Sequence, residues 1–271
     1  MNAGADRYAR MFDRLKEKSE GAYIPFVMLC DPDEGTSGDI LETLAASGAD
    51  ALELGIPFSD PVADGPVIQE AANRALATGA TPEHCFRVIK NFREKHPEMP
   101  IGLLVYANLL VSVGIASFYR AAAACGVDSV LVADAPLSAY TAFAPQAEAN
   151  GIAPVYIAPP NADMCKLRAV AEKSGGYVYF LGRSGVTGAD REMQFLSSAN
   201  IEILKEAGAA PIVVGFGISR PDHVRNALAS GAQGAISGSG TVRIVASNLG
   251  EIGRMREELA GFTRDMKAST M

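Results

Sequence analysis

The sequence is poor in the residues from which metal and thiol sites are built. It has three histidines and four cysteines among 271 residues. His84, His96 and His223 fall in or near predicted helices, and no cluster of His, Asp and Glu has metal-ligand spacing, so we expect no metal centre. The cysteines form no CxxC pair, and we expect reduced, small core residues at Cys30, Cys85, Cys125 and Cys165.

Long apolar runs and an excess of positive charge are also missing. The longest apolar runs, such as residues 101–105, are far shorter than the roughly 20 residues of a membrane-spanning helix. With 31 acidic and 24 basic residues the net charge is −7, which disfavours nucleic acid as a partner. Residues 1–18 place Tyr8, Met11, Phe12 and Leu15 at helical spacing, with no signal-peptide stretch after them. We therefore expect a cytoplasmic protein that begins with an amphipathic helix.

The sequence does contain a regular alternation of strands and helices. Eight short apolar or β-branched segments recur, and most precede a helical stretch, which indicates parallel strands with crossover helices. Eight units close a barrel, whereas a doubly wound open sheet is disfavoured because no GxGxxG motif follows the first strand. We predict an α/β fold, a single (β/α)8 TIM barrel domain over residues 1–271 with an extra N-terminal helix. The predicted strands are residues 22–30, 51–54, 101–105, 129–133, 154–157, 177–181, 211–215 and 234–237, and helices are predicted at 39–46, 115–124, 163–173, 221–229 and 241–247.

Three of these strands are preceded by a glycine in a short phrase of small residues, at Gly48, Gly126 and Gly231. Glycine at such a position suits the left-handed end of a helix just before the next strand. These phrases mark the stability face of the barrel. Catalytic and binding groups are then expected at the opposite end, on the loops that follow the strands.

The second predicted strand carries a carboxylate. Because alternate strand residues face opposite ways, Ala51, Glu53 and Gly55 should face the barrel interior. A carboxyl group in that dry interior has a raised pKa, which suits general acid–base catalysis. The alternative is a structural Glu53 paired with an arginine. In the proline-rich loop that follows, Asp64 is the candidate second catalytic carboxylate and Asp60 has a loop-shaping or interface role.

Glycine clusters follow the sixth, seventh and eighth strands, at residues 182–188, 215–219 and 237–241. Glycine allows backbone amides to approach an anion, and the last cluster leads into a helix N-terminus. In such barrels phosphate binds after strands seven and eight. The cluster at 182–188 is followed by polar residues, and we expect it to be a lid. The lysines lie outside the predicted strands, which disfavours a Schiff base. The residues thus indicate cofactor-free, carboxylate-driven proton transfer on a phosphorylated ligand.

Strings of residues resemble the tryptophan synthase alpha chain family over essentially the whole chain. The longest is Leu52-Glu53-Leu54-Gly55-Ile56-Pro57-Phe58-Ser59-Asp60-Pro61 with Ala63-Asp64-Gly65-Pro66. Others are Tyr106-Ala107-Asn108, Gly185-Val186-Thr187-Gly188, Gly215-Phe216-Gly217-Ile218-Ser219 and Gly234-Ala235-Ile236-Ser237-Gly238-Ser239. The chain departs from the pattern at Cys30, where glycine is expected, and at Gly182-Arg183-Ser184 before the expected lid.

The resemblance implies a lyase that splits indole-3-glycerol phosphate into indole and glyceraldehyde 3-phosphate by a retro-aldol step, late in tryptophan biosynthesis. It implies Glu53 as general acid–base, Asp64 as the partner of the indole nitrogen, and Tyr179 as an active-site tyrosine. No cofactor is implied. The resemblance further assigns substrate binding to Phe26, Leu104, Thr187, Gly188, Phe216, Gly217, Gly238 and Ser239.

The resemblance also implies a partner, a pyridoxal-phosphate tryptophan synthase beta chain in an alpha2beta2 heterotetramer. Residues 57–64, 106–108 and 134–136 would form the contact. A stand-alone lyase that releases free indole is the alternative. A phosphosugar isomerase, an indole-glycerol-phosphate synthase and a non-catalytic, ligand-binding regulatory subunit are further hypotheses. The synthase would require catalytic lysines at strand ends, where none is found.

Overall fold

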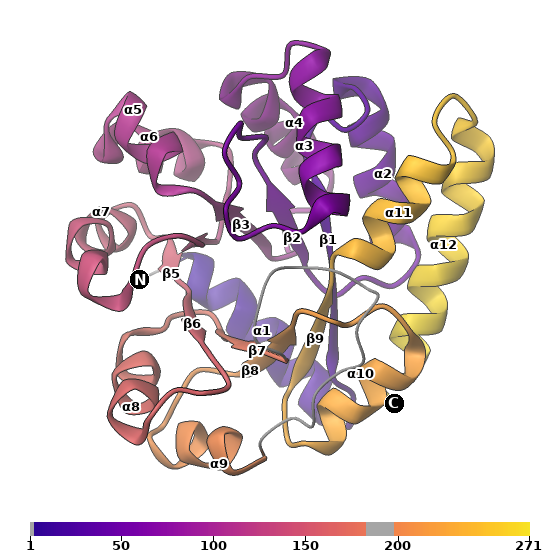
Figure 1. Ribbon diagram of the computed structural model, residues 1–271. Helices are drawn as coiled ribbons and strands as arrows, with labels where there is room; N and C mark the ends of the chain where they lie inside the picture. The colour runs from indigo at the N-terminus through magenta and orange to yellow at the C-terminus, as the bar shows by residue number, and fades with distance from the viewer. Residues whose placement is uncertain (1–2, 183–197) are drawn as a thin grey trace.

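A computed structural model describes residues 3–182 and 198–271 and shows a closed ring of parallel strands surrounded by helices (Figure 1). The strand order is β5-β4-β3-β2-β1-β9-β8-β7-β6. Strands β5 and β6 are two pieces of one segment separated by Val155, whose N–H donates to the Val130 carbonyl, so this segment closes the ring between β4 and β7. The strands are β1 (Ala22–Met28), β2 (Leu52–Gly55), β3 (Ile101–Val105), β4 (Ser129–Val132), β5 (Ala153–Pro154), β6 (Tyr156–Ala158), β7 (Val178–Leu181), β8 (Ile212–Gly215) and β9 (Gly234–Ser237).

Helices lie around this ring, and each predicted helix is present within a few residues of its predicted bounds (Figure 1). The closed barrel with its N-terminal helix is therefore confirmed. The described helices are α1 (Ala3–Glu17), α2 (Glu34–Ala46), α3 (Pro66–Ala77), α4 (Pro82–Lys95), α5 (Ala107–Val113), α6 (Ile115–Ala124), the 3-10 helix η1 (Leu137–Ala142), α7 (Ala144–Ala149), α8 (Met164–Lys173), α9 (Ser198–Glu206), α10 (Pro221–Ala229), α11 (Ser239–Ser247) and α12 (Ile252–Ala268).

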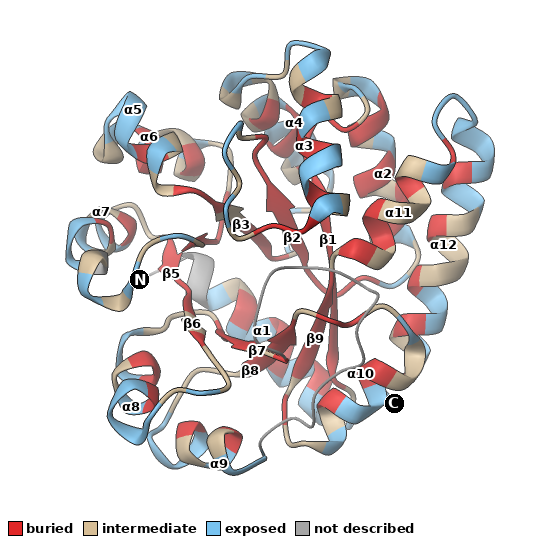
Figure 2. Ribbon diagram, viewed as in Figure 1, coloured by how far each residue is buried: buried red, intermediate tan, exposed pale blue. Residues whose placement is uncertain are grey.

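The strands are largely buried (Figure 2), and their side chains alternate between one cluster inside the barrel and two clusters between the barrel and the helices. Leu52 and Leu54 of β2 pack with the surrounding helices, whereas Ala51 belongs to the cluster inside the barrel. A Cβ built on Gly55 would meet Phe26 and Met28, which also point inward. This is the predicted orientation of the second strand, and it places Glu53 inside the barrel.

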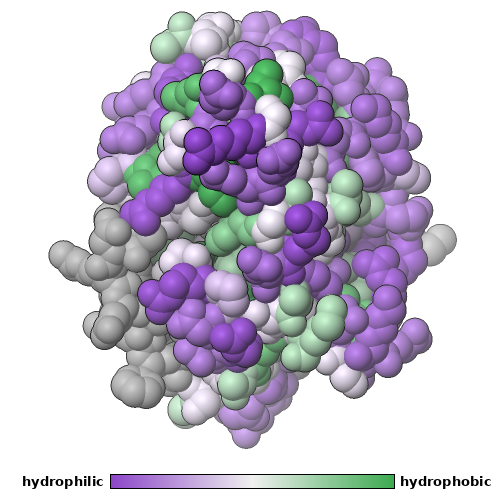
Figure 3. All heavy atoms as spheres, turned by 90° about the vertical axis from the view of Figure 1, so that its right-hand side faces the viewer, coloured by the Kyte–Doolittle hydropathy of each residue, from purple (hydrophilic) through white to green (hydrophobic). Residues whose placement is uncertain are grey.

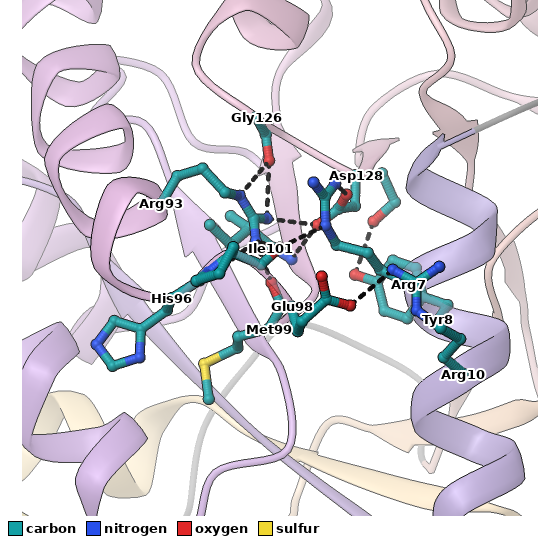
Figure 4. A network of polar contacts seen from close by, with 12 residues as sticks. Arg7, Tyr8, Arg10, Arg93, His96, Glu98, Met99, Ile101, Gly126 and Asp128 are labelled. Carbon is teal, nitrogen blue, oxygen red and sulfur yellow. Dashed lines mark hydrogen bonds and ion pairs between the residues drawn. The ribbon is translucent and has the colours of Figure 1, made fainter.

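Helix α1 covers the end of the barrel where the strands begin. Its predicted apolar stripe of Tyr8, Met11, Phe12 and Leu15 is buried in the interior cluster. A polar network fixes the helix there, because the fully buried Asp128 pairs with Arg7 of α1 and Arg93 of α4, each at 2.6 Å (Figure 4). The N-terminal helix therefore closes the barrel end opposite to the loops that follow the strands.

The glycine phrases lie at this same end, at the turns from helix to strand. Gly48, Gly126 and Gly231 have positive φ values of 104°, 83° and 99°, as their proposed helix-ending role requires. Strand β1 ends at Met28, two residues earlier than predicted, because Cys30 has a φ of 61° and turns the chain. Not all the cysteines are core residues: Cys165 is exposed on α8 and Cys125 is half-buried, so the prediction is wrong for these two.

The outer surface of the barrel is largely hydrophilic on the side covered by α11 and α12 (Figure 3). Its hydrophobic residues form small, separate spots. Within the described ranges no single helix is long and apolar enough to cross a membrane. The pair α5 and α6 reaches the required length and composition only together, across a 100° bend.

Candidate active site

One pocket opens where β1, β2, β3, β7, β8 and β9 end, and about 420 Å³ of space, partly open to solvent, lies among its walls. All predicted site residues in the described part of the chain line it. Thr187 and Gly188 lie outside the described residues, as does the expected lid except for Gly182. The lining residues are Phe26, Glu53, Asp64, Ile68, Leu104, Tyr179, Phe216, Gly217, Ile218, Ile236, Gly238 and Ser239.

Glu53 is a buried carboxyl group on β2, with 1% of its surface exposed. The Tyr177 hydroxyl donates to its Oε1 at 2.7 Å, while Oε2 has no partner among the described residues. Burial raises the pKa of Glu53 to about 8 against the lowering effect of the hydrogen bond from Tyr177, and the negative charge of Asp64 contributes to the rise. In the described ranges no arginine or lysine pairs with Glu53, which argues against the structural alternative. This carboxyl group is therefore protonated near pH 7.

Asp64 follows β2 on the loop that leads into α3 and is 6% exposed. Its Oδ2 accepts a hydrogen bond of 2.8 Å from the Tyr106 hydroxyl. Burial raises the pKa of Asp64 to about 6, and the hydrogen bond from Tyr106 limits that rise. Near pH 7 the pocket thus holds one neutral and one ionised carboxyl group, which are a proton donor and a fixed negative charge.

Tyr179 enters the pocket from β7 and requires a glycine beside it. A Cβ on Gly215 of β8 would lie 2.1 Å from the Tyr179 hydroxyl oxygen, so no larger residue fits there without moving the ring. The Tyr179 ring meets the Phe216 ring edge-on, with centroids 6.1 Å apart. Burial raises the pKa of Tyr179 well above its usual value, so the phenol stays neutral. The absence of a side chain at Gly215 thus allows the Tyr179 ring to pack closely against β8.

The rim of the pocket after β8 and β9 has the backbone features of an anion site. Phe216 and Gly217 have positive φ values of 67° and 86°, which turn the chain sharply after β8. Gly238 precedes α11, and Ser239 is the first residue of that helix. The free amides and the positive dipole end of α11 therefore face the same pocket as the carboxyl groups, at the predicted phosphate position.

Several residues of the site were not predicted from the sequence as site residues. Tyr177 contacts Glu53 directly, and its position two residues before Tyr179 on an alternating strand is a signal that identifies it as inward-facing. Tyr106 was singled out only as part of a partner contact. The pocket also contains Ile68, Ile218 and Ile236. No group of three metal-ligating side chains occurs in the searched ranges 3–182 and 198–271.

Comparison with known proteins identifies the family of this chain. The profile of the family described as "Tryptophan synthase alpha chain" matches residues 12–271. The alpha chain of Pectobacterium atrosepticum is 52% identical over 265 residues, which span 98% of this chain and 99% of the relative. The alpha chain of Yersinia enterocolitica is 51% identical over 265 residues, which span the same shares of the two chains.

Solved structures show the same fold. Tryptophan synthase subunit alpha from Legionella pneumophila superposes with a TM-score of 0.87 at 25% identity, covering 97% of this chain and 98% of that one. A chain from the tryptophan synthase a2b2 complex of Pyrococcus furiosus gives 0.83 at 35% identity, covering 91% and 98%. The chain therefore belongs to the tryptophan synthase alpha chain family and functions as the alpha subunit, an indole-3-glycerol phosphate lyase.

Proposed function

We propose that Glu53 is the general acid–base and Asp64 the electrostatic partner in the cleavage of indole-3-glycerol phosphate to indole and glyceraldehyde 3-phosphate. The observation that supports these roles is the pair of carboxyl groups in one pocket, with pKa values of about 8 and about 6. Two such groups differ in protonation near pH 7, as a donor and a fixed charge require.

The reaction requires two proton movements. Glu53 donates a proton to the indole ring carbon that bears the glycerol chain, and Oε2 is the oxygen left free by Tyr177 for this step. Positive charge then develops on the indole N–H, where ionised Asp64 stabilises it. The resulting Glu53 carboxylate accepts the proton of the adjacent glycerol hydroxyl. The C–C bond breaks as the aldehyde forms, its electron pair restores the aromatic ring, and Glu53 is again protonated.

The remaining pocket residues suit the two ends of the substrate. Phe26, Leu104 and Phe216 offer apolar surface for the indole ring. At the other end the phosphate would bind the amides of Gly217, Gly238 and Ser239, with Thr187 and Gly188 as further predicted contacts outside the described residues. Tyr179 is the third proposed active-site side chain and would pack beside the indole ring of the substrate.

We also propose that the chain binds a tryptophan synthase beta chain, a pyridoxal-phosphate enzyme, in an alpha2beta2 assembly. The a2b2 complex of Pyrococcus furiosus contains a chain of this fold. Segments 57–64, 106–108 and 134–136 follow β2, β3 and β4, on the side of the barrel where the pocket opens. Val62, Val111 and Val113 are 73%, 56% and 49% exposed there, apolar surface that a partner would cover. The single domain over residues 1–271 and the cytoplasmic location stay predictions.

The test is an assay of indole release from indole-3-glycerol phosphate by the purified chain, alone and with the beta chain. Glu53→Gln keeps the size of the side chain and removes the titratable proton, so turnover should fall by about 10²–10⁴-fold with the fold retained. The matched control is Glu70→Gln on the exposed face of α3, which should not alter turnover.

Unchanged turnover in Glu53→Gln would exclude the acid–base role of Glu53. Size-exclusion chromatography with and without the beta chain tests the assembly. No shift in elution, together with equal turnover in both samples, would instead support a stand-alone lyase that releases indole.

A further inference from the structure

Tyr106 is a buried tyrosine that follows β3 and precedes α5, with 3% of its surface exposed. Its side-chain contacts are with the loop between β2 and α3. The hydroxyl donates to Asp64 Oδ2 at 2.8 Å and accepts from the Ala63 N–H at 3.2 Å. The ring stacks on Phe58 with centroids 5.3 Å apart and an interplanar angle of 22°. One side chain directly after β3 therefore contacts three residues of the loop that carries Asp64.

The two hydrogen bonds of the Tyr106 hydroxyl together fix where its proton points. Because this oxygen accepts from a backbone amide, its own proton is directed to the Asp64 carboxylate. Among the described residues, the titratable groups that face this carboxylate are Glu53 from β2, Tyr179 from β7 and Tyr106 itself. A carboxyl group and a phenol never carry a positive charge, so neither Glu53 nor Tyr179 offsets the charge of the Asp64 carboxylate. Tyr106 is thus the described side chain that favours the ionised form of Asp64.

We infer that Tyr106 is a positioning residue for the lyase reaction: it holds the Asp64 carboxylate ionised at the pocket wall and fixes the loop that carries it. This inference rests on the proposed role of Asp64. It does not require contact between Tyr106 and the substrate. Asp64 lies on a loop and not on a strand, and the hydroxyl and the ring of Tyr106 contact this loop at separate points.

The test is Tyr106→Phe, which retains the ring stacked on Phe58 and removes only the hydroxyl. The profile of kcat/KM against pH reports the ionisation of the free enzyme, and its acid limb should follow Asp64 near pH 6. Without the hydroxyl the ionised form of Asp64 loses its donor, so the limb should move up by about one pH unit. Relative to wild type, kcat/KM should fall roughly eightfold at pH 5.5 and less than about twofold at pH 7.5.

Two further variants separate the possible outcomes. Tyr119→Phe removes the hydroxyl of another buried tyrosine, on α6 and away from the pocket, and should leave the limb in place. Asp64→Asn should abolish the limb and lower turnover at every pH. An unmoved limb in Tyr106→Phe, with activity either normal or lowered equally at all pH values, would overturn the positioning role. An unaffected Asp64→Asn variant would instead refute the proposed role of Asp64, on which this inference rests.

Discussion

Replacing Glu53 with glutamine should change the stability of the barrel in a way that depends on pH. Below pH 4.5 the Glu53 carboxyl is neutral in both the folded and the unfolded chain. Between pH 4.5 and about 8 it ionises only when the chain unfolds, because burial raises the pKa of the folded form to about 8. The wild-type chain therefore loses stability as pH rises through this window. Glutamine has no ionisable group, so the Glu53→Gln variant lacks this loss.

The size of the effect follows from the two pKa values of Glu53, which are 4.5 in the unfolded chain and about 8 in the folded chain. Each pH unit between them lowers the free energy of unfolding by about 1.36 kcal/mol. Stability of the variant relative to wild type should then rise by about 3 kcal/mol from pH 4.5 to pH 7, and by about 5 kcal/mol by pH 9. Domains are usually stable by only about 5–15 kcal/mol, so this contribution of one side chain is large enough to measure.

The assay is urea unfolding of wild type and variant at pH 5, 7 and 9. Far-UV circular dichroism is the suitable probe because the chain has no tryptophan. Groups that do not interact with Glu53 titrate equally in both proteins, so the difference in unfolding free energy reports on Glu53 and its coupling to Asp64. Glu70→Gln on the exposed face of α3 is the control for removal of a carboxyl group outside the barrel. A constant difference for Glu53→Gln would refute the reasoning, because it would mean that Glu53 is ionised at neutral pH and has no proton to donate.

Two further predictions concern the frame around the pocket. Asp128→Asn should lower the free energy of unfolding by about 3–5 kcal/mol, because it leaves the guanidinium groups of Arg7 and Arg93 without their buried counterion; a loss below about 1 kcal/mol in urea unfolding would contradict this. Gly215→Ala should displace the Tyr179 ring, since the added Cβ would lie 2.1 Å from its hydroxyl oxygen. Steady-state kinetics should show lower kcat/KM in this variant, and wild-type kinetics would mean that the ring position does not matter for the reaction.

Local sequence patterns were sufficient to predict the barrel, its helix-to-strand turns and the inward orientation of Glu53. Strand alternation predicted that Glu53 faces the interior, and the parity of β2 in the structure agrees because a strand has only two faces. Glycine phrases predicted the turns at Gly48, Gly126 and Gly231, since few other residues adopt their positive φ values. Eight strand-and-helix units predicted closure. Each of these signals is carried by a few neighbouring residues.

Contacts between residues distant in the sequence could not be predicted in this way. Tyr177 lies 124 residues from Glu53, and Tyr106 lies 42 residues from Asp64, so neither hydrogen bond has a local signature. The same holds for Asp128 and Arg7, which are 121 residues apart and form the ion pair that holds α1 against the end of the barrel where the strands begin. Such contacts exist only once the ring of strands has closed.

The sequence by itself determined the barrel, the face of β2 on which Glu53 lies and the end of the barrel that carries the site. Only the tertiary structure decided how the two carboxyl groups differ. Glu53 is surrounded by strands from the whole ring and accepts one hydrogen bond, from Tyr177, whereas Asp64 lies at the mouth and accepts its own from Tyr106. Desolvation is the sum over all surrounding chain segments, so a pKa near 8 or near 6 is a property of the folded barrel and not of any stretch of sequence.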